Sequence, residues 1–253
     1  MTHIARSDQY PVAVVHRDLS SEPVPMGGGA EAFETPAAVG INHARLEHLA
    51  SLGLSLQGRR VLDVGCGVGY LARFFVEREC SVTGVDGREA NLAVLRRRHP
   101  GVETRLVDLD RQTLEPLGGF EVVFCYGLLY HLENPVAGLR SMAAVCEELF
   151  LLETLVCDRA EPVMVLVDEP RVHNQALGQL GSRPSPSYVV MALNRVGFPF
   201  IYAPREPPHH PDFRFAWRND FSIAHDGHNL RCIFVASRHR LNNPQLVTLL
   251  EAG

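Results

Sequence analysis

The sequence predicts an α/β protein with a doubly wound, mostly parallel sheet of seven strands and helices on both of its faces. Short apolar runs alternate along the chain with segments of helical periodicity. The runs are apolar almost throughout rather than at every second residue, as in strands that are covered on both sides. One run ends in a glycine-rich turn that leads into a helix, a junction at which α/β domains bind ligands.

The order of the elements follows from these patterns. Leu46, Leu49 and Leu52 are spaced as on one face of a helix, so we expect a helix over 41–52 that leads into the first strand. The expected strands are 61–64, 82–86, 103–107, 120–126, 148–152, 200–202 and 230–235. The other expected helices are 69–78, 88–98 and 187–196.

The most informative stretch runs from Val61 to Tyr70 and reads VLDVGCGVGY. Glycines let the backbone approach a ligand closely, and Gly65, Gly67 and Gly69 stand where the strand turns into the helix. Dinucleotide enzymes have G-x-G-x-x-G at this place, whereas this turn reads G-x-G-x-G with an acid, Asp63, just before it. An acid there suits a ligand with a cationic amino-acid part.

Two further acids follow the next two strands. Asp86 ends the second strand, at the distance from the turn at which an acid reaches ribose hydroxyls. Asp108 ends the next apolar stretch. Any one of the three acids could merely end a strand or cap a helix, but all three in this order indicate a nucleotide-like ligand.

These residues resemble the class I S-adenosylmethionine-dependent methyltransferases, whose sheet is Rossmann-like. The resemblance implies S-adenosylmethionine as cofactor and S-adenosylhomocysteine as its product. It places Asp63 near the methionyl end, Asp86 on the ribose hydroxyls, and Asp108 with Leu109 beside adenine. The cofactor-binding residues that we predict are Asp63, Gly65, Cys66, Gly67, Gly69, Tyr70, Asp86, Gly87, Asp108, Leu109 and Tyr126.

We interpret residues 1–253 as a single methyltransferase domain. Residues 1–40 would form an N-terminal arm or lid, 41–153 the cofactor-binding half and 154–253 the acceptor-side half. Insertions at 154–184 and 204–229 contain several prolines and little periodicity. Long loops inside a domain are usually functional or mobile, so we expect these insertions and the arm to select the acceptor.

The segment 124–135 would run off the carboxyl end of the fourth strand, where open α/β sheets bind ligands. With 151–156 and 185–187, it is similar to the tRNA wobble-uridine carboxymethyltransferases over about residues 40–198. That family uses a carboxylated S-adenosylmethionine, held by a tyrosine that Tyr130 matches and by a lysine. This chain contains no lysine, so ordinary S-adenosylmethionine is the expected donor.

His131 is the predicted catalytic base. Methyl transfer from a sulfonium is an in-line displacement, so a base is needed only when the acceptor carries a proton that it does not readily lose. Histidine titrates near neutral pH, and His131 lies on the segment that should face the donor. Tyr130 would orient the acceptor or the base. The alternatives are a structural histidine beneath the loop and a tyrosine in the pocket wall.

The second insertion leaves a metal site open as an alternative. It contains several possible ligands, namely His209, His210, Asp212, His225 and His228. His210-Pro211-Asp212 with a later histidine matches the H-x-D…H order of some non-haem iron sites, but the pattern is short and common. We therefore predict no metal and expect a polar loop that caps the pocket. Trp217 and Arg218 could stack on or pair with a flat or anionic acceptor.

Composition narrows the partners and the compartment. The formal net charge is -5 and all 24 basic residues are arginine, so the charge argues against a nucleic-acid partner but leaves a local basic patch open. The six cysteines form no C-x-x-C pair. The first residues lack the apolar core of a signal peptide, and no apolar run approaches the ~18 residues of a membrane span. We expect reduced thiols and a cytoplasmic protein without membrane insertion.

The sequence thus predicts S-adenosylmethionine-dependent methylation of a small-molecule acceptor, at oxygen in preference to nitrogen. The alternative enzyme is one that modifies a tRNA wobble uridine. The alternative from another class is a binding or regulatory module that keeps the cofactor fold without turnover. The acceptor, the methylated atom and the oligomeric state are left open.

Overall fold

The computed structural model describes residues 5–6, 13–14, 31–169 and 175–251. Much of the predicted arm, together with 170–174 and 252–253, lies outside this part of the chain. Strands β1 (Ala5–Arg6) and β2 (Ala13–Val14) pair with each other, and the 3-10 helix η1 is Glu31–Phe33. Helix α1 (Pro36–Ser51) begins earlier than predicted, because Thr35 Oγ1 accepts a hydrogen bond from the Ala38 N–H and caps the helix.

The centre of the protein is an eight-stranded sheet with the order β14-β10-β13-β7-β6-β3-β4-β5. The parallel strands are β3 (Arg60–Val64), β4 (Ser81–Asp86), β5 (Glu103–Leu106), β6 (Phe120–Tyr126) and β7 (Cys146–Leu155). Antiparallel pairing then adds β13 (Arg231–Ser237), β10 (Phe200–Pro204) and β14 (Leu246–Glu251). The doubly wound, mostly parallel α/β fold is therefore confirmed.

The predicted number of seven strands was wrong by one, because β14 joins the sheet beyond β10. Pro204 lies opposite Leu246 and Ala203 opposite Val247 in this edge pair. Val247 and Leu249 of β14 are exposed. An edge strand of this kind lacks the continuous burial that makes inner strands visible in a sequence.

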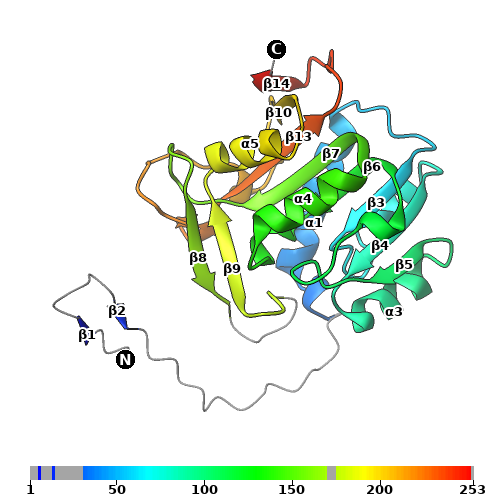
Figure 1. Cartoon of the computed structure of the whole chain (residues 1–253), viewed down its shortest axis with the longest axis horizontal. Coiled ribbons are helices and arrows are strands. Elements are labelled where there is room, and N and C mark those ends of the chain that lie inside the picture. Colours follow the sequence, from blue (N-terminus) through cyan, green and yellow to red (C-terminus); the bar gives the residue numbers. More distant parts are fainter. Residues whose placement is uncertain (1–4, 7–12, 15–30, 170–174, 252–253) are drawn as a thin grey trace.

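Helices cover both faces of the sheet. On one face, α1, α2 (Ala72–Val76) and α3 (Glu89–Arg98) pack on the strands, and on the other lie α4 (Pro135–Val145) and α5 (Pro186–Arg195). Figure 1 shows α4 in front of the sheet and α1 behind it. Successive residues of β3 serve opposite faces, since Val61 packs with the first group and Leu62 with the second. Helix α2 is shorter than the predicted 69–78, and α4 was not predicted.

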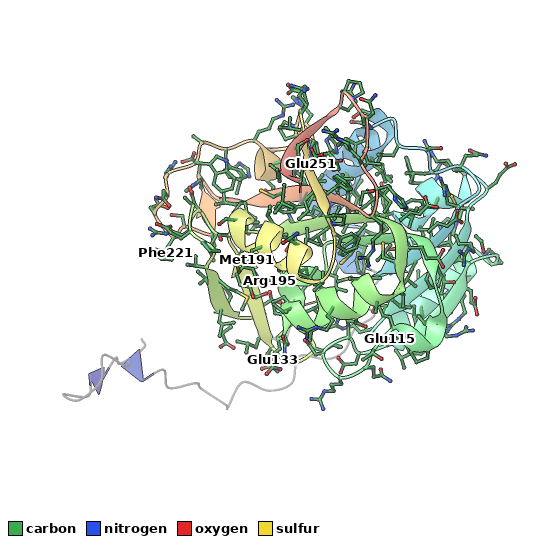
Figure 2. The ribbon with its side chains drawn as sticks, turned by 45° about the horizontal axis from the view of Figure 1, so that its top comes forward. Glu115, Glu133, Met191, Arg195, Phe221 and Glu251 are labelled. Carbon is green, nitrogen blue, oxygen red and sulfur yellow. The ribbon has the colours of Figure 1, made fainter. Side chains whose placement is uncertain are left out.

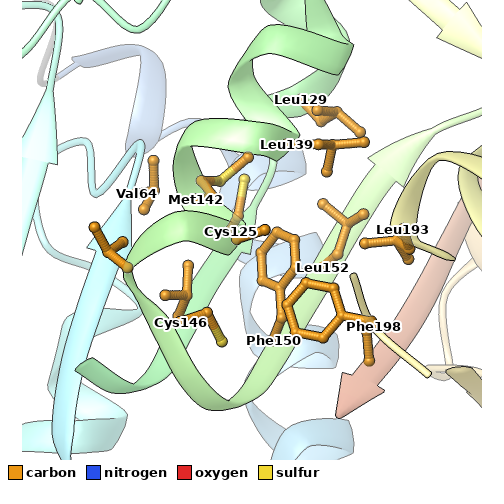
Figure 3. Packing of buried hydrophobic residues seen from close by; sticks show 14 of the residues in the cluster. Val64, Cys125, Leu129, Leu139, Met142, Cys146, Phe150, Leu152, Leu193 and Phe198 are labelled. Carbon is orange, nitrogen blue, oxygen red and sulfur yellow. The ribbon is translucent and has the colours of Figure 1, made fainter. Parts of the chain in front are cut away.

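The core beneath α4 and α5 is aromatic and aliphatic. Phe150 of β7 and Phe198 are both 0% exposed, and their ring centroids lie 5.7 Å apart. Met142 and Leu139 of α4 and Leu193 of α5 complete this layer, as Figure 3 shows. The outer side of α5 carries Met191 and Arg195 toward the surface (Figure 2).

The insertion at 154–184 contains regular structure that was not predicted. Strands β8 (Met164–Asp168) and β9 (Leu180–Pro184) form an antiparallel pair with Leu166 opposite Ser182. β8 lies in the apolar run VMVLV at 163–167, a strand signal that was missed, whereas β9 reads LGSRP and has no apolar run by which a sequence would show a strand.

The insertion at 204–229 holds only the short elements η4 (Pro211–Phe213), β11 (Ala224–His225) and β12 (His228–Asn229). The buried Asp158 fixes it: its Oδ2 accepts the Arg218 N–H at 2.6 Å and faces His225 Nε2 at 2.7 Å, and its Oδ1 accepts the Asn219 N–H at 2.9 Å. The remaining 3-10 helices are η2 (Glu115–Leu117) and η3 (Leu129–His131). Within the described ranges, no helix is both long and apolar enough to cross a bilayer.

Phe150→Ala should lower the free energy of unfolding by about 3–5 kcal/mol, because it opens a cavity against Phe198. Val247→Ala, at a side chain that is 41% exposed, is the control and should change it by less than about 0.5 kcal/mol. Urea titration of both variants measures the difference. A loss below about 1 kcal/mol for Phe150→Ala would contradict the packing described here.

Candidate active site

A cavity of about 650 Å³ lies at the carboxyl ends of the parallel strands. Strands β4 and β6 lie on opposite sides of β3, and both pair with it. The strand order therefore reverses at β3, and open α/β sheets bind ligands at the carboxyl edge of such a point. The cavity walls include nine of the predicted cofactor residues, which are Gly65, Cys66, Gly67, Tyr70, Asp86, Gly87, Asp108, Leu109 and Tyr126. Tyr130 and His131 line the same cavity. Asp63 and Gly69, which were also predicted, do not line it.

The glycine turn after β3 needs glycine at each of its three positions. Gly65, Gly67 and Gly69 have φ angles of 76°, 52° and 80°, a region that side chains disfavour. A Cβ on Gly69 would lie 2.1 Å from Leu95 Cδ1 of α3. Gly69 therefore allows close packing of α3 on the turn, whereas Gly65 and Gly67 line the cavity itself.

Asp86 at the end of β4 holds the turn in place. Its Oδ2 accepts the Gly67 N–H at 3.0 Å, and its Oδ1 accepts the Arg88 N–H at 2.8 Å and the Asn91 side-chain N–H at 3.1 Å. Burial raises the pKa of Asp86, and these hydrogen bonds oppose the rise. The carboxylate is thus fixed by the turn while it lines the cavity.

Asp63 lies underneath the turn, 2% exposed, and its Oδ2 has no hydrogen-bond partner among the described residues. Burial, with a smaller contribution from Asp86, raises the pKa of Asp63 to about 7. The hydroxyl of Tyr126, in the cavity wall, is also buried without a partner. Unpaired buried polar groups are costly, so a polar group of a ligand fits the cavity beside the Tyr126 hydroxyl, whereas Asp63 acts on the cavity from beneath the turn.

A buried ion network lies beside the cavity around Glu153, which is 0% exposed near the end of β7. Arg45 Nη2 of α1 lies 2.5 Å from Glu153 Oε2, and Arg231 Nη1 of β13 lies 2.9 Å from Oε1. Arg231 Nε also pairs with Asp212 at 3.1 Å, and its Nη1 lies 3.4 Å from the Tyr130 hydroxyl. Burial raises the pKa of Glu153, but the two guanidinium groups outweigh it and lower the pKa overall.

His131 reaches the cavity from η3, next to this network. Its Nδ1 lies 2.6 Å from Oε2 of Glu169, a residue just beyond β8 that is 2% exposed. Burial lowers the pKa of His131, and Glu169 opposes that change. A neutral imidazole in a cavity wall can accept a proton from an acceptor near pH 7.

The residues of the predicted cap lie in different parts of the structure. His210 Nδ1 and His228 Nδ1 lie 3.9 and 3.8 Å from Asp212 Oδ1, and all three residues line the cavity. His210 Nδ1 already accepts the Asp212 N–H at 3.2 Å. His225 lies away from them, with Asp158 and Asp220, where the three ligand atoms fall within 4.8 Å of one another. Asp158 already accepts two backbone N–H groups and contacts His225 Nε2, and the absence of a metal stays a prediction.

Trp217, which was predicted as a possible acceptor contact, lines a separate apolar cavity with Phe215 and Leu249. Arg218 pairs with Asp226 at the surface, 3.6 Å away. His209 does not line the cavity of the glycine turn either.

Arg45, Glu153, Glu169 and Arg231 were not predicted as site residues. Glu153 carried a usable signal, because it directly follows the apolar run LFLL at 149–152, and a charge that continues a buried strand must be paired. Its partners come from 108 and 78 residues away, so the sequence could not name them.

Comparisons with known proteins show which proteins the chain is similar to. The family model described as "Methyltransferase domain" matches residues 61–148. The ubiquinone biosynthesis O-methyltransferase of Bordetella avium is 38% identical over 109 residues, which are 42% of this chain and 45% of that protein. The tRNA U34 carboxymethyltransferase of Haemophilus influenzae is 34% identical over 162 residues, 60% of this chain and 48% of that protein.

Residues 61–148 of the chain thus match a methyltransferase domain, and the relatives named here are methyltransferases. The chain spans about half the length of the curated relatives that it matches.

Solved structures show the same fold. The N-terminal domain of EvdMO1 with S-adenosylhomocysteine bound gives a TM-score of 0.60 at 23% identity and covers 79% of this chain and 80% of that chain. An S-adenosylmethionine-dependent methyltransferase from Mesorhizobium loti gives 0.56 at 23% identity, over 77% and 98%. The predicted resemblance to S-adenosylmethionine-dependent methyltransferases is confirmed by the matching domain model and relatives.

The raised pKa of Asp63 has a consequence for stability. A carboxyl whose pKa is about 7 in the folded state and 3.8 in the unfolded chain favours folding as the neutral acid, so the free energy of unfolding falls as the pH rises from about 4 to about 7. Asp63→Asn cannot ionise and should gain stability relative to wild type, by about 4 kcal/mol between pH 4 and pH 8. Denaturant titrations across this range, with the exposed Glu77→Gln as control, measure the change. A difference independent of pH would refute it.

Proposed function

We propose that the protein transfers a methyl group from S-adenosylmethionine to an oxygen atom of a polar small molecule. The observation that carries this proposal is a single cavity whose walls contain the glycine turn and Asp86 together with His131 and Tyr130. A donor site and a proton acceptor thus share one space, as methylation of a hydroxyl requires.

In this proposal the donor half is held by the residues that the family resemblance names. Asp86 binds the ribose hydroxyls, and Asp108 with Leu109 flanks adenine. The backbone of the turn at Gly65 and Gly67 binds the methionyl part of the donor. Asp63 would act through the turn from below, since its carboxyl is buried there with one oxygen unpaired. S-adenosylmethionine supplies an electrophilic methyl group on a sulfonium.

His131 accepts the proton of the acceptor hydroxyl as the C–O bond forms. Tyr130 mainly forms part of the cavity wall and orients the acceptor, because its hydroxyl faces Arg231. A catalytically silent module would not need a buried, neutral histidine beside the donor half. This argument favours an enzyme over that alternative.

The chemistry of the acceptor half favours a polar molecule. Its walls contain charged side chains that are already paired, Arg45 and Arg231 with Glu153 and Asp212, and these can exchange hydrogen bonds with hydroxyl groups. The names of the Bordetella and Pseudomonas relatives support transfer to oxygen. Modification of a tRNA is the second candidate, and the name and 60% coverage of the Haemophilus relative support it.

A cytoplasmic location remains the prediction of the sequence. The six cysteines are all free thiols, which fits a reducing compartment.

Calorimetric titration of ligand-free protein with S-adenosylmethionine and S-adenosylhomocysteine tests the donor site. Asp86→Ala should weaken both affinities by about tenfold or more, because it removes the proposed ribose contact and releases the Gly67 N–H. Glu77→Ala, an exposed carboxylate on the same half, should bind as wild type does. Unchanged affinity in Asp86→Ala would remove this residue from the donor site.

His131→Ala should lower kcat by about 10²- to 10⁴-fold on any hydroxyl acceptor that wild type turns over, with donor affinity unchanged. Release of S-adenosylhomocysteine measures turnover in a screen of sugars, phenols and hydroxy acids. The exposed His239→Ala is the matched control. A turnover number equal to that of wild type would exclude His131 as the base.

A further inference from the structure

We propose that Glu169 is the positioning residue for the base: its carboxylate holds the His131 imidazole with a proton on Nδ1 and leaves the lone pair of Nε2 directed to the acceptor. This inference rests on the proposed function, since it concerns the same base. It adds a residue from the insertion at 154–184, which lies 38 positions from His131 in the chain.

The contact itself determines the tautomer. The 2.6 Å separation of His131 Nδ1 from Glu169 Oε2 is that of a charge-assisted hydrogen bond. An ionised carboxylate only accepts, so the proton of this bond belongs to Nδ1. His131 lines the cavity, and no described group forms a hydrogen bond with its Nε2. The unprotonated nitrogen therefore lies on the side where an acceptor would bind.

Glu169 is itself held from several elements. Its Oε2 also accepts the Ala176 N–H at 2.8 Å, and its Oε1 accepts from Arg183 Nη2 at 3.1 Å. Arg183 of β9 donates further to the backbone oxygens of Tyr130 and Ser182. These bonds connect β8, β9 and η3 through one carboxylate that is 2% exposed. Its rotation is therefore restricted, and so is that of the imidazole.

Glycine at position 181 makes room for this arrangement. A Cβ there would lie 2.5 Å from Glu169 Oε1 and 2.7 Å from the Tyr130 backbone oxygen. β9 therefore approaches the carboxylate more closely than any other residue type would permit.

The charges around His131 suit a base that is neutral before the reaction. Glu169, Arg183 and Arg231 are the charged groups that act on it; the carboxylate raises the pKa of the imidazole, and the two guanidinium groups and burial lower it. Hydrogen bonds and nearby positive charge lower the pKa of Glu169, so the carboxylate stays ionised near pH 7.

The proton and the methyl group balance without a further reagent. The acceptor O–H bond breaks and its proton moves to Nε2 of His131, while the oxygen forms a bond to the methyl carbon. The C–S bond breaks and its electron pair remains on sulfur, which becomes the neutral thioether of S-adenosylhomocysteine. The imidazolium, with Glu169 as its counter-ion, then gives the proton to solvent.

Nitrogen NMR of protein labelled in its histidines, with S-adenosylhomocysteine as the added probe, tests the positioning role without an acceptor. The His131 signals are identified by their loss in His131→Gln. In wild type above the pKa we expect a protonated Nδ1 and an unprotonated Nε2. In Glu169→Gln the pKa of His131 should fall by about one unit or more, because burial then acts unopposed by the carboxylate.

Glu161→Gln is the matched control, because Glu161 is an exposed carboxylate on the same insertion that also pairs with an arginine, Arg159. It should leave both the tautomer and the pKa of His131 unchanged. Glu169→Asp keeps the charge and should retain most of the pKa of wild type, which covers the case that Glu169→Gln does not fold. A wild-type His131 protonated on Nε2, or a pKa that does not respond to the loss of the carboxylate, overturns the proposal.

The same variants separate this inference from the proposed function. On an acceptor found by the screen, Glu169→Gln should lower kcat by about 10- to 100-fold and shift the acidic limb of the pH profile to lower pH, with donor affinity unchanged. A merely structural role would lower kcat without that shift and so contradicts positioning. Failure of wild type to bind S-adenosylmethionine would instead refute the proposed function, while the tautomer still decides the role of Glu169.

Discussion

The structure depends most on one buried carboxylate, that of Glu153 on the central strand β7. Taking a charge out of water costs several kcal/mol unless it is paired, and Glu153 is paired on both oxygens by Arg45 and Arg231. These arginines come from the first long helix and from an antiparallel strand near the end of the chain. The ion network therefore fixes the distance between α1 and β13, and both form walls of the same cavity.

The division of the cavity follows from the sheet topology. Parallel strands present their carboxyl ends at one edge of the sheet. Asp63, Asp86 and the turn between β3 and α2 therefore lie close together there as a result of the strand order alone. Antiparallel addition of β13 places a polar wall beside this edge. The proposed donor half consists of backbone and carboxylates on consecutive elements, whereas the proposed acceptor half is assembled from elements that are distant in the chain.

The N-terminal elements complete the donor half from above. Phe33 of η1 lies so close to the turn that a Cβ on Gly67 would come within 2.8 Å of its ring. Arg98 of α3 pairs with Glu34 at 2.6 Å beside it. Within the predicted arm, Ala32, Phe33, Ala37 and Ala38 thus belong to the cavity wall.

The sequence by itself determined the donor half of the protein. Asp63, the three glycines, Asp86 and Asp108 lie on successive βα units, and local rules for strand ends and turns suffice to bring them together. The inner strands were predicted for the same reason, because burial on both faces leaves a continuous apolar run. Only tertiary structure decided the hairpin of β8 and β9, the edge strand β14, the pairing of Glu153 and the contact of Glu169 with His131. Each of these features depends on a partner that is distant in the chain. A sequence can indicate that a strand or a buried charge is present, but it does not indicate which residues pair with it.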